Sequence, residues 1–314
     1  MKKFIGKAIL FCGLFVFLLL GVCALATVPS FKPFLADVTN TSDYIENTAV
    51  KEILPAIDSV ETQDGKTKLI IGDSVCFRLF DWYRKENPDY CIAPTNRGVG
   101  MSGQYILAEV FLENHPEATD VYLVITTNTL ITGYETIHGY QYAVQPFLER
   151  GHLQRLDDDT LDEMKATYGA FVTNEKMLRF VDESPILKKA YFNVLNEYFA
   201  KNVKMEIPHV VEHYIVKMHE LCEEKGVTMH LLPSPIPESK ERRELEFDLE
   251  KLYHETEIYP LFPEYYENLT YYPAEYFSDG IHPDLDSEGT CGLIHDIQEK
   301  NEVLEDFQLP YIKK

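Results

Sequence analysis

Basic residues are in short supply in this sequence. The 314 residues include 29 lysines and arginines against 51 aspartates and glutamates, a formal net charge of −22 at pH 7. Three of the lysines precede an apolar N-terminal segment, so the rest of the chain carries 26 basic and 51 acidic side chains. A body this acidic repels phosphate backbones and anionic headgroups, which argues against nucleic acid as a partner. The acidity can serve solubility alone. If the substrate is an anionic wall polymer, its close approach requires local basic residues or ions.

Closely spaced cysteines are absent. Cys12 and Cys23 lie in the apolar segment, and the other four are scattered along the chain: Cys76, Cys91, Cys222 and Cys291. No C-x-x-C pair indicates a metal or redox site, so we expect no cofactor. Four cysteines allow three complete disulfide pairings, and the sequence does not choose among them. We expect Cys76 to be a small buried residue rather than a nucleophile.

Long apolar runs are also rare, and the one that occurs lies near the N-terminus. Ala8 to Val28 is an uncharged run of 21 residues, which at about 1.5 Å per residue just crosses a hydrocarbon core of about 30 Å. Lys2, Lys3 and Lys7 before it favour an inside N-terminus and an extracytoplasmic body. A cleavable signal peptide is the alternative, because 24–26 reads Ala-Leu-Ala, but the run exceeds the usual h-region of about 7 to 15 residues. We therefore predict a retained membrane anchor over 1–28 and a membrane-proximal linker over 29–65.

One stretch predicts a strand, a sharp turn and a helix. From Lys66 to Phe80 the chain reads KTKLIIGDSVCFRLF, in which an apolar run of strand character breaks at Gly72-Asp73-Ser74. A serine just after such a strand lies at the carboxyl edge of a parallel sheet, where open α/β folds bind ligands. Its backbone N–H is one of the unpaired donors at the start of the next helix. Ser74 therefore offers a hydroxyl and an anion-stabilising amide, and we expect Asp73 to brace the turn.

A second stretch supplies partners for such a serine. Residues 277–284 read FSDGIHPD, with Asp279 and His282 three residues apart. A nucleophilic serine needs a base to take its proton and a carboxylate to hold that base in one tautomer. One tight loop can carry both groups.

The two stretches together resemble blocks one and five of the SGNH (GDSL-type) hydrolase family. Two further blocks have candidates. The loop 96–103 matches the family's glycine block but is longer by about two residues, so Gly100 and Gly103 are both candidate donors. Thr126-Thr127-Asn128-Thr129 matches the block Gly-x-Asn-Asp at Asn128, with threonine in place of the glycine and the aspartate. The resemblance implies an oxyanion hole made of the Ser74 amide, a glycine amide and the Asn128 side chain.

The resemblance also implies the fold. We expect residues 66–314 to form an α/β domain with a doubly wound, flavodoxin-like parallel sheet of about five strands. About 95 residues separate Asn128 from the next strand, which predicts a helical cap insertion over about 130–225. Four aromatic residues early in this insertion are either the core of the cap or a stacking platform for sugar rings: Tyr134, Tyr140, Tyr142 and Phe147. Core packing is the favoured interpretation.

One motif within the insertion offers a metal site. His209, Glu212 and His213 fit the H-x-x-E-H pattern, in which two histidines on one helix face bind zinc. The segment runs directly into an apolar strand at 227–232, as an ordinary crossover helix does. No other metal cluster in the sequence supports the motif, and we predict no metal there.

The parts predict a serine hydrolase mechanism, with Ser74 as nucleophile, His282 as base and Asp279 as its orienting carboxylate. The acyl-enzyme is resolved by water in an esterase or by a sugar hydroxyl in an O-acyltransferase. A membrane-anchored, extracytoplasmic body is similar to SGNH-like proteins that acylate cell-surface glycans, often beside a multi-spanning acyl exporter. The expected substrate is therefore an acylated cell-surface glycan or another ester. The alternative is a non-catalytic SGNH-fold partner in an envelope acylation complex.

Overall fold

Four parallel strands form the central sheet. The computed structural model describes residues 2–45, 48–96, 99–136, 139–199 and 205–312. The strands are β1 (Lys68–Gly72), β2 (Tyr90–Ile92), β3 (Asp120–Ile125) and β4 (Thr228–Pro233), in the order β2-β1-β3-β4. Lys68 pairs with Tyr90 on one side and with Asp120 on the other, and all three interfaces are parallel. The carboxyl ends of the strands therefore meet at one edge, and the predicted α/β class with a parallel sheet is confirmed.

Helices cover both faces of this sheet because successive side chains of each strand point to opposite faces. Leu69 and Ile71 of β1 are buried in one core with α3 (Thr48–Glu61), α5 (Gly100–Asn114) and α11 (His209–Lys225). Ile70 is buried in a second core with α4 (Ser74–Phe80) and α13 (Ser287–Asn301). Strands buried on both faces explain the continuous apolar runs in the sequence.

The main sheet has four strands rather than about five. The segments after β4 form two-residue strands, β5 (Ile236–Pro237) and β6 (Tyr271–Tyr272), which pair with each other in a separate small sheet. Pro235 precedes β5, Pro237 is its last residue, and Pro273 follows β6. Proline has no backbone N–H to donate, which limits how far such pairing extends. Helix α12 (Lys240–His254) lies between β5 and β6 in the chain.

The expected linker over 29–65 contains a core helix. After the short helix α2 (Lys32–Val38) and the turn η1 (Ser42–Tyr44), α3 packs against α5 and β2. Ile53, Ile57 and Val60 of α3 are fully buried. Their spacing of three and four residues places them on one helix face, which is the signal that the sequence carried for a packed helix.

The cap is narrower than expected. It consists of η3 (Gly139–Val144), α7 (Gln145–Glu149), η4 (Leu153–Arg155), α8 (Asp158–Tyr168), η5 (Ala170–Thr173), α9 (Glu175–Glu183) and α10 (Pro185–Phe199). Helix α11 does not belong to the cap, because it packs along α5 and leads into β4 as a crossover helix. Tyr134, Tyr140, Tyr142 and Phe147 are all buried, which confirms core packing for these aromatic residues.

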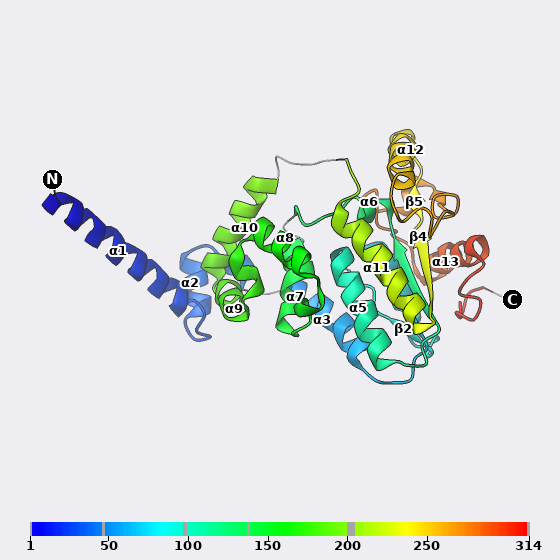
Figure 1. The fold of residues 1–314 in the computed structure, drawn as a ribbon, viewed down its shortest axis with the longest axis horizontal. Helices are drawn as coiled ribbons and strands as arrows, with labels where there is room; N and C mark the ends of the chain where they lie inside the picture. Colours follow the sequence, from blue (N-terminus) through cyan, green and yellow to red (C-terminus); the bar gives the residue numbers. More distant parts are fainter. Residues whose placement is uncertain (1, 46–47, 97–98, 137–138, 200–204, 313–314) are drawn as a thin grey trace.

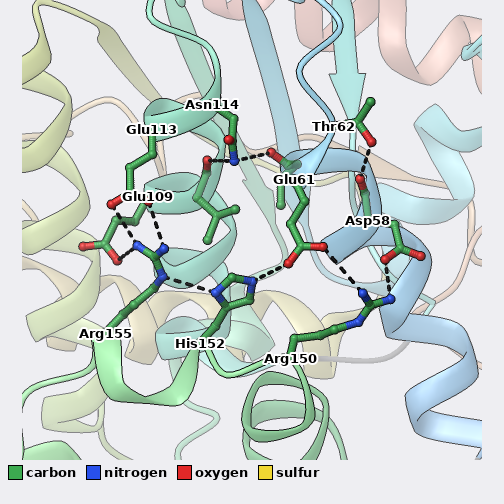
Figure 2. A network of polar contacts seen from close by, with 11 residues as sticks. Asp58, Glu61, Thr62, Glu109, Glu113, Asn114, Arg150, His152 and Arg155 are labelled. Carbon is green, nitrogen blue, oxygen red and sulfur yellow. Dashed lines mark hydrogen bonds and ion pairs between the residues drawn. The ribbon is translucent and has the colours of Figure 1, made fainter.

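Charged side chains fasten the cap to the sheet domain (Figure 2). Arg155 of η4 binds Glu109 at 3.1 Å and Glu113 at 2.9 Å, both on α5. His152 binds Glu61 of α3 at 2.7 Å, and Arg150 pairs with Asp58 of the same helix. The cap thus rests on both α3 and α5 through several linked ion pairs, a geometry that restrains its position more than an isolated surface pair would.

Helix α1 (Lys2–Leu25) leaves the body at the cap end (Figure 1). Its stretch Phe4–Leu25, 22 residues, is long and apolar enough to cross a membrane. Most of α1 is exposed, whereas Cys23 and the following Ala26 are buried against the rest of the chain. An N-terminal helix that fits a membrane span is therefore shown, and its attachment point is the cap.

The burial of α3 generates a stability prediction. Ile57→Ala should lower the free energy of unfolding by about 2 to 5 kcal/mol, because it leaves a cavity between α3 and α5. Urea denaturation of the detergent-solubilised chain, followed by circular dichroism, measures the change. The control is Val194→Ala, at a side chain of α10 that is 64% exposed, where a change within about 0.5 kcal/mol is expected. Equal urea midpoints for Ile57→Ala and Val194→Ala would show that residues 29–65 are a linker detached from the core.

Candidate active site

The predicted nucleophile turn follows β1 directly. Gly72 ends the strand, and a Cβ there would lie 2.0 Å from the carbonyl oxygen of Val124 on β3. Only glycine allows the strand to leave the sheet this close to its neighbour. The buried Gln104 of α5 donates to the carbonyl of Gly72 at 2.8 Å. Ser74, the first residue of α4, is therefore placed at the carboxyl edge of the sheet.

A buried carboxylate, Asp73, holds this turn together. Its Oδ1 accepts the backbone N–H groups of Val75 and Cys76 at 3.0 and 3.2 Å, so Asp73 caps α4. Its Oδ2 accepts from the backbone N–H and hydroxyl of Thr126 at 2.7 and 2.9 Å and from the hydroxyl of Thr129 at 2.7 Å. One carboxylate thus joins the end of β1 to the end of β3, and the predicted bracing role is confirmed.

The two threonines of this set are the positions that depart from the SGNH pattern. Thr126 stands where the family has glycine and Thr129 where it has aspartate. Both hydroxyls donate to Asp73, so each departure serves the nucleophile turn. Sequence reasoning missed this role. A polar Thr-Thr-Asn-Thr run directly after a buried strand was the available signal.

The Asp279–His282 loop is built by its own carboxylate. Asp279 Oδ1 accepts the backbone N–H groups of Ile281 and His282 at 3.2 and 2.9 Å, while Gly280 adopts a φ of +78° between them. Phe277 and Pro283 form an isolated antiparallel bridge across the base of the loop. Glycine is suited to this left-handed conformation because it has no Cβ.

Three predicted residues form a continuous hydrogen-bonded chain. His282 Nδ1 lies 2.7 Å from Asp279 Oδ2, and His282 Nε2 lies 2.7 Å from Ser74 Oγ. A carboxylate accepts but does not donate, so the proton is assigned to Nδ1. Nε2 is then the acceptor for the Ser74 hydroxyl. This is the arrangement of a nucleophile, a base and an orienting group.

Asp279 stays ionised at neutral pH. The hydrogen bond from the His282 backbone, together with that from the His282 ring, lowers the pKa of Asp279 from 3.8 to about 2. The carboxylate side chain is 55% exposed, whereas His282 is 24% exposed. Asp279 therefore orients the imidazole from its solvent side.

A cavity of about 330 Å³ opens beside Ser74 and His282. Gly100, at the start of α5, and Asn128 line the same cavity, so the structure brings four of the predicted residues together. Gly103 lies outside the lining, because it packs one turn into α5 against the ring of Phe147. Of the glycine loop, 97 and 98 lie outside the described residues. A larger cavity of about 420 Å³ lies between α13 and the C-terminal segment, away from these groups.

The side chain of Asn128 is held by an arginine that sequence reasoning missed. Arg242 of α12 donates from Nη1 to Asn128 Oδ1 at 3.0 Å and from Nη2 to the Thr127 hydroxyl at 2.7 Å. The same Nη2 lies 2.6 Å from Glu246, one helical turn later. The sequence does show an Arg and a Glu four residues apart in a charged helix. Such a pair does not indicate which face of the helix is buried.

The side chains of the H-x-x-E-H motif and the cysteines are the other candidate sites from the sequence, and they have contacts of their own. His213 binds Asp157 at 2.7 Å, and Glu212 accepts the backbone N–H of Glu257 at 2.6 Å. Within the described ranges, no group of three or more metal-ligating residues occurs. All six cysteines are free, and Cys76 is fully buried, which raises the pKa of its thiol well above the usual value. The expectation that Cys76 is a small buried residue is confirmed.

No family model, curated protein or solved structure matches this chain. The resemblance to SGNH hydrolases stays a prediction from the sequence motifs.

The contacts of Asp73 generate a prediction. Asp73→Asn replaces one accepting oxygen by a donor, so buried donors of Val75 and Cys76 or of Thr126 and Thr129 lose their partner. We expect a loss of about 1.5 to 3 kcal/mol in the free energy of unfolding. Chemical denaturation measures it. The matched control is Asp81→Asn, whose surface pair with Arg84 is worth about 0 to 1 kcal/mol. An Asp73 variant no less stable than this control would contradict the bracing role.

Proposed function

We propose that this protein is a membrane-anchored serine esterase or O-acyltransferase that acts, outside the cytoplasm, on acyl groups of a cell-surface glycan. The observation that carries the proposal is the chain from Ser74 through His282 to Asp279, with both hydrogen bonds at 2.7 Å. These groups come from opposite ends of the sequence and meet at one edge of the sheet, beside a cavity. Such an edge is where open α/β sheets bind ligands.

Acylation begins at the serine. His282 Nε2 takes the Ser74 proton as Oγ attacks the ester carbonyl, and Asp279 stabilises the imidazolium that forms. The tetrahedral intermediate collapses to an acyl-enzyme when the C–O bond to the alcohol breaks and His282 returns the proton to the leaving oxygen. Water or a sugar hydroxyl, deprotonated by the same imidazole, then attacks the acyl carbonyl, the bond to Ser74 Oγ breaks, and His282 returns the proton to Oγ.

Three donors are available for the oxyanion. The Ser74 and Gly100 amides start helices α4 and α5, where backbone N–H groups have no partner within the helix. The Asn128 side-chain amide lines the same cavity. Loss of one such donor typically costs about 2.7 to 4 kcal/mol of transition-state stabilisation. Gly103 is not among them, because it packs inside α5.

The N-terminal helix and the charge of the body favour a substrate in the cell envelope. Helix α1 fits a membrane span, and the lysines at its N-terminal end favour a body on the outer side. The acidic body favours a neutral glycan over a polyanion, unless ions screen the charge. A multi-spanning acyl exporter is the kind of partner that would deliver acyl groups to such a site.

The test uses the full chain in detergent with p-nitrophenyl acetate and a fluorophosphonate probe. Ser74→Ala should abolish labelling, and Ser74→Ala and His282→Ala should each lower kcat by at least about 10³-fold. Ser59→Ala and His295→Ala, at residues outside the cavity lining, serve as matched controls with full activity. Added glycan acceptors then separate transfer from hydrolysis. No labelling of folded wild type would favour the non-catalytic partner, and labelling that persists in Ser74→Ala would refute the serine mechanism.

A further inference from the structure

Helix α12 presents two adjacent arginines in different environments. Arg243 is 54% exposed and pairs with Glu238, whereas Arg242 is 11% exposed and turned toward the loop after β3. Glu246 lies on the same face as Arg242 and is 3% exposed. Leu249 and Tyr253 of α12 are also buried, so the Arg242–Glu246 pair lies on the inward face of the helix, at the edge of the candidate active site.

The buried pair contacts the loop that carries Asn128. Arg242 reaches Asn128 and Thr127, and the Thr127 hydroxyl donates to Glu246 at 2.8 Å. Thr127, Asn128, Arg242 and Glu246 are thus linked by one continuous set of polar contacts. Within the described chain, Arg242 Nε and Glu246 Oε2 are buried without a hydrogen-bond partner. A buried ion pair with unmet groups is a weak source of stability, so its placement calls for another explanation.

The chemistry of the contact between Arg242 and Asn128 explains why the pair is placed there. An asparagine side chain has an accepting end and a donating end, whereas a guanidinium only donates. Arg242 can therefore bind only Oδ1, and the opposite orientation would set the NH₂ group against a cation. The donating end, Nδ2, has no partner in the described residues and remains available to an acceptor at the cavity that Asn128 lines.

We infer that Arg242 is a positioning residue, which fixes the Asn128 amide so that Nδ2 serves as an oxyanion donor. The inference rests on the proposed function and adds a residue that does not touch the substrate. Glu246 and Thr127 hold the guanidinium in place. Because the donor is oriented before the reaction, no reorganisation is required when charge develops on the substrate oxygen.

The test is a double-mutant cycle on kcat with p-nitrophenyl acetate. Arg242→Met combined with Glu246→Leu removes the pair without leaving one buried charge unpaired. We expect kcat to fall by about 10²- to 10³-fold, as it does in Asn128→Ala, with KM changed by less than about threefold. Adding the pair change to Asn128→Ala should cause no further loss, because the donor is already absent. Arg243→Met is the control and should keep wild-type activity.

The outcomes separate the two claims. Absence of Ser74-dependent activity in the wild type would refute the proposed function, and the role of Arg242 with it. A wild type with Ser74-dependent activity, together with a pair variant that retains its kcat, would overturn the positioning role alone. Losses that multiply with Asn128→Ala would also overturn it, since they would mean that the pair acts elsewhere. Thermal melts of each variant report whether the fold is kept.

A separate observation concerns the short helix after α1. Phe31, Phe34 and Val38 are 50%, 65% and 66% exposed. Phe31 is the N-cap of α2, and the spacing of three and four residues places it on the same side as Phe34 and Val38 of the helix. The opposite side is attached to the body, because Ala36 is buried and Lys189 of the cap donates to the Asn40 carbonyl at 2.8 Å. An exposed apolar face is thus held in a fixed orientation.

The place of this face in the chain identifies what covers it. The apolar stretch of α1 ends at Leu25, six residues before Phe31, and six residues span at most about 20 Å. Cys23 and Ala26 are already buried against the body, so the body begins where the span ends. We propose that Phe31, Phe34 and Val38 insert into the membrane interface, where such apolar faces are stabilised. Together with α1 they would fix how the cap faces the lipid.

Tryptophan quenching tests this surface in bilayers with brominated lipid tails. The native tryptophan is removed by Trp82→Phe, and single reporters are placed by Phe34→Trp, by Phe11→Trp in α1 and by Phe247→Trp on exposed α12. We expect quenching and blue-shifted emission for the first two reporters and neither for the third. A position 34 reporter that behaves like the one at 247, or an unquenched reporter at 11, would overturn the proposal.

Discussion

The candidate site depends on the carboxylate of Asp73. It closes the turn that starts α4 and, with its second oxygen, holds the loop after β3. The nucleophile candidate and the asparagine candidate are therefore placed by the same group, one on either side of it. A buried carboxylate that accepts five hydrogen bonds stays in place because each donor would otherwise lose its partner. Much of the geometry of the cavity follows from this one interaction.

The contacts of Asp73 explain the two threonines that depart from the SGNH pattern. Threonine in place of glycine and aspartate adds two hydroxyls, and both are used to bind Asp73. Asn128 is then oriented from outside its own block, by an arginine that lies 114 positions later in the chain. The side chains of this short motif are thus held by contacts from other elements, Asp73 on one side and Arg242 on the other.

The cap and the apolar helix α1 add a second level of organisation. Arg155, His152 and Arg150 hold the cap on α3 and α5, and the cap in turn receives the end of α1 (Figures 1 and 2). On this side the cavity is lined by Gly139 and Ala143 of the cap and by Tyr134 just before it. The same cap therefore connects the end of the apolar helix α1 to one wall of the candidate site.

The parallel α/β sheet, the apolar N-terminal helix and the residues of the hydrogen-bonded chain could all be predicted from the sequence. These are local signals: an apolar strand run, a Gly-Asp-Ser turn, and an Asp and a His within one tight loop. Three features emerge only in the folded molecule: α3 is buried in the core, Gly100 rather than Gly103 lines the cavity, and Arg242 holds Asn128. Each depends on which face of a helix is buried against distant segments, and a pattern of charges or glycines along a helix does not specify that partner.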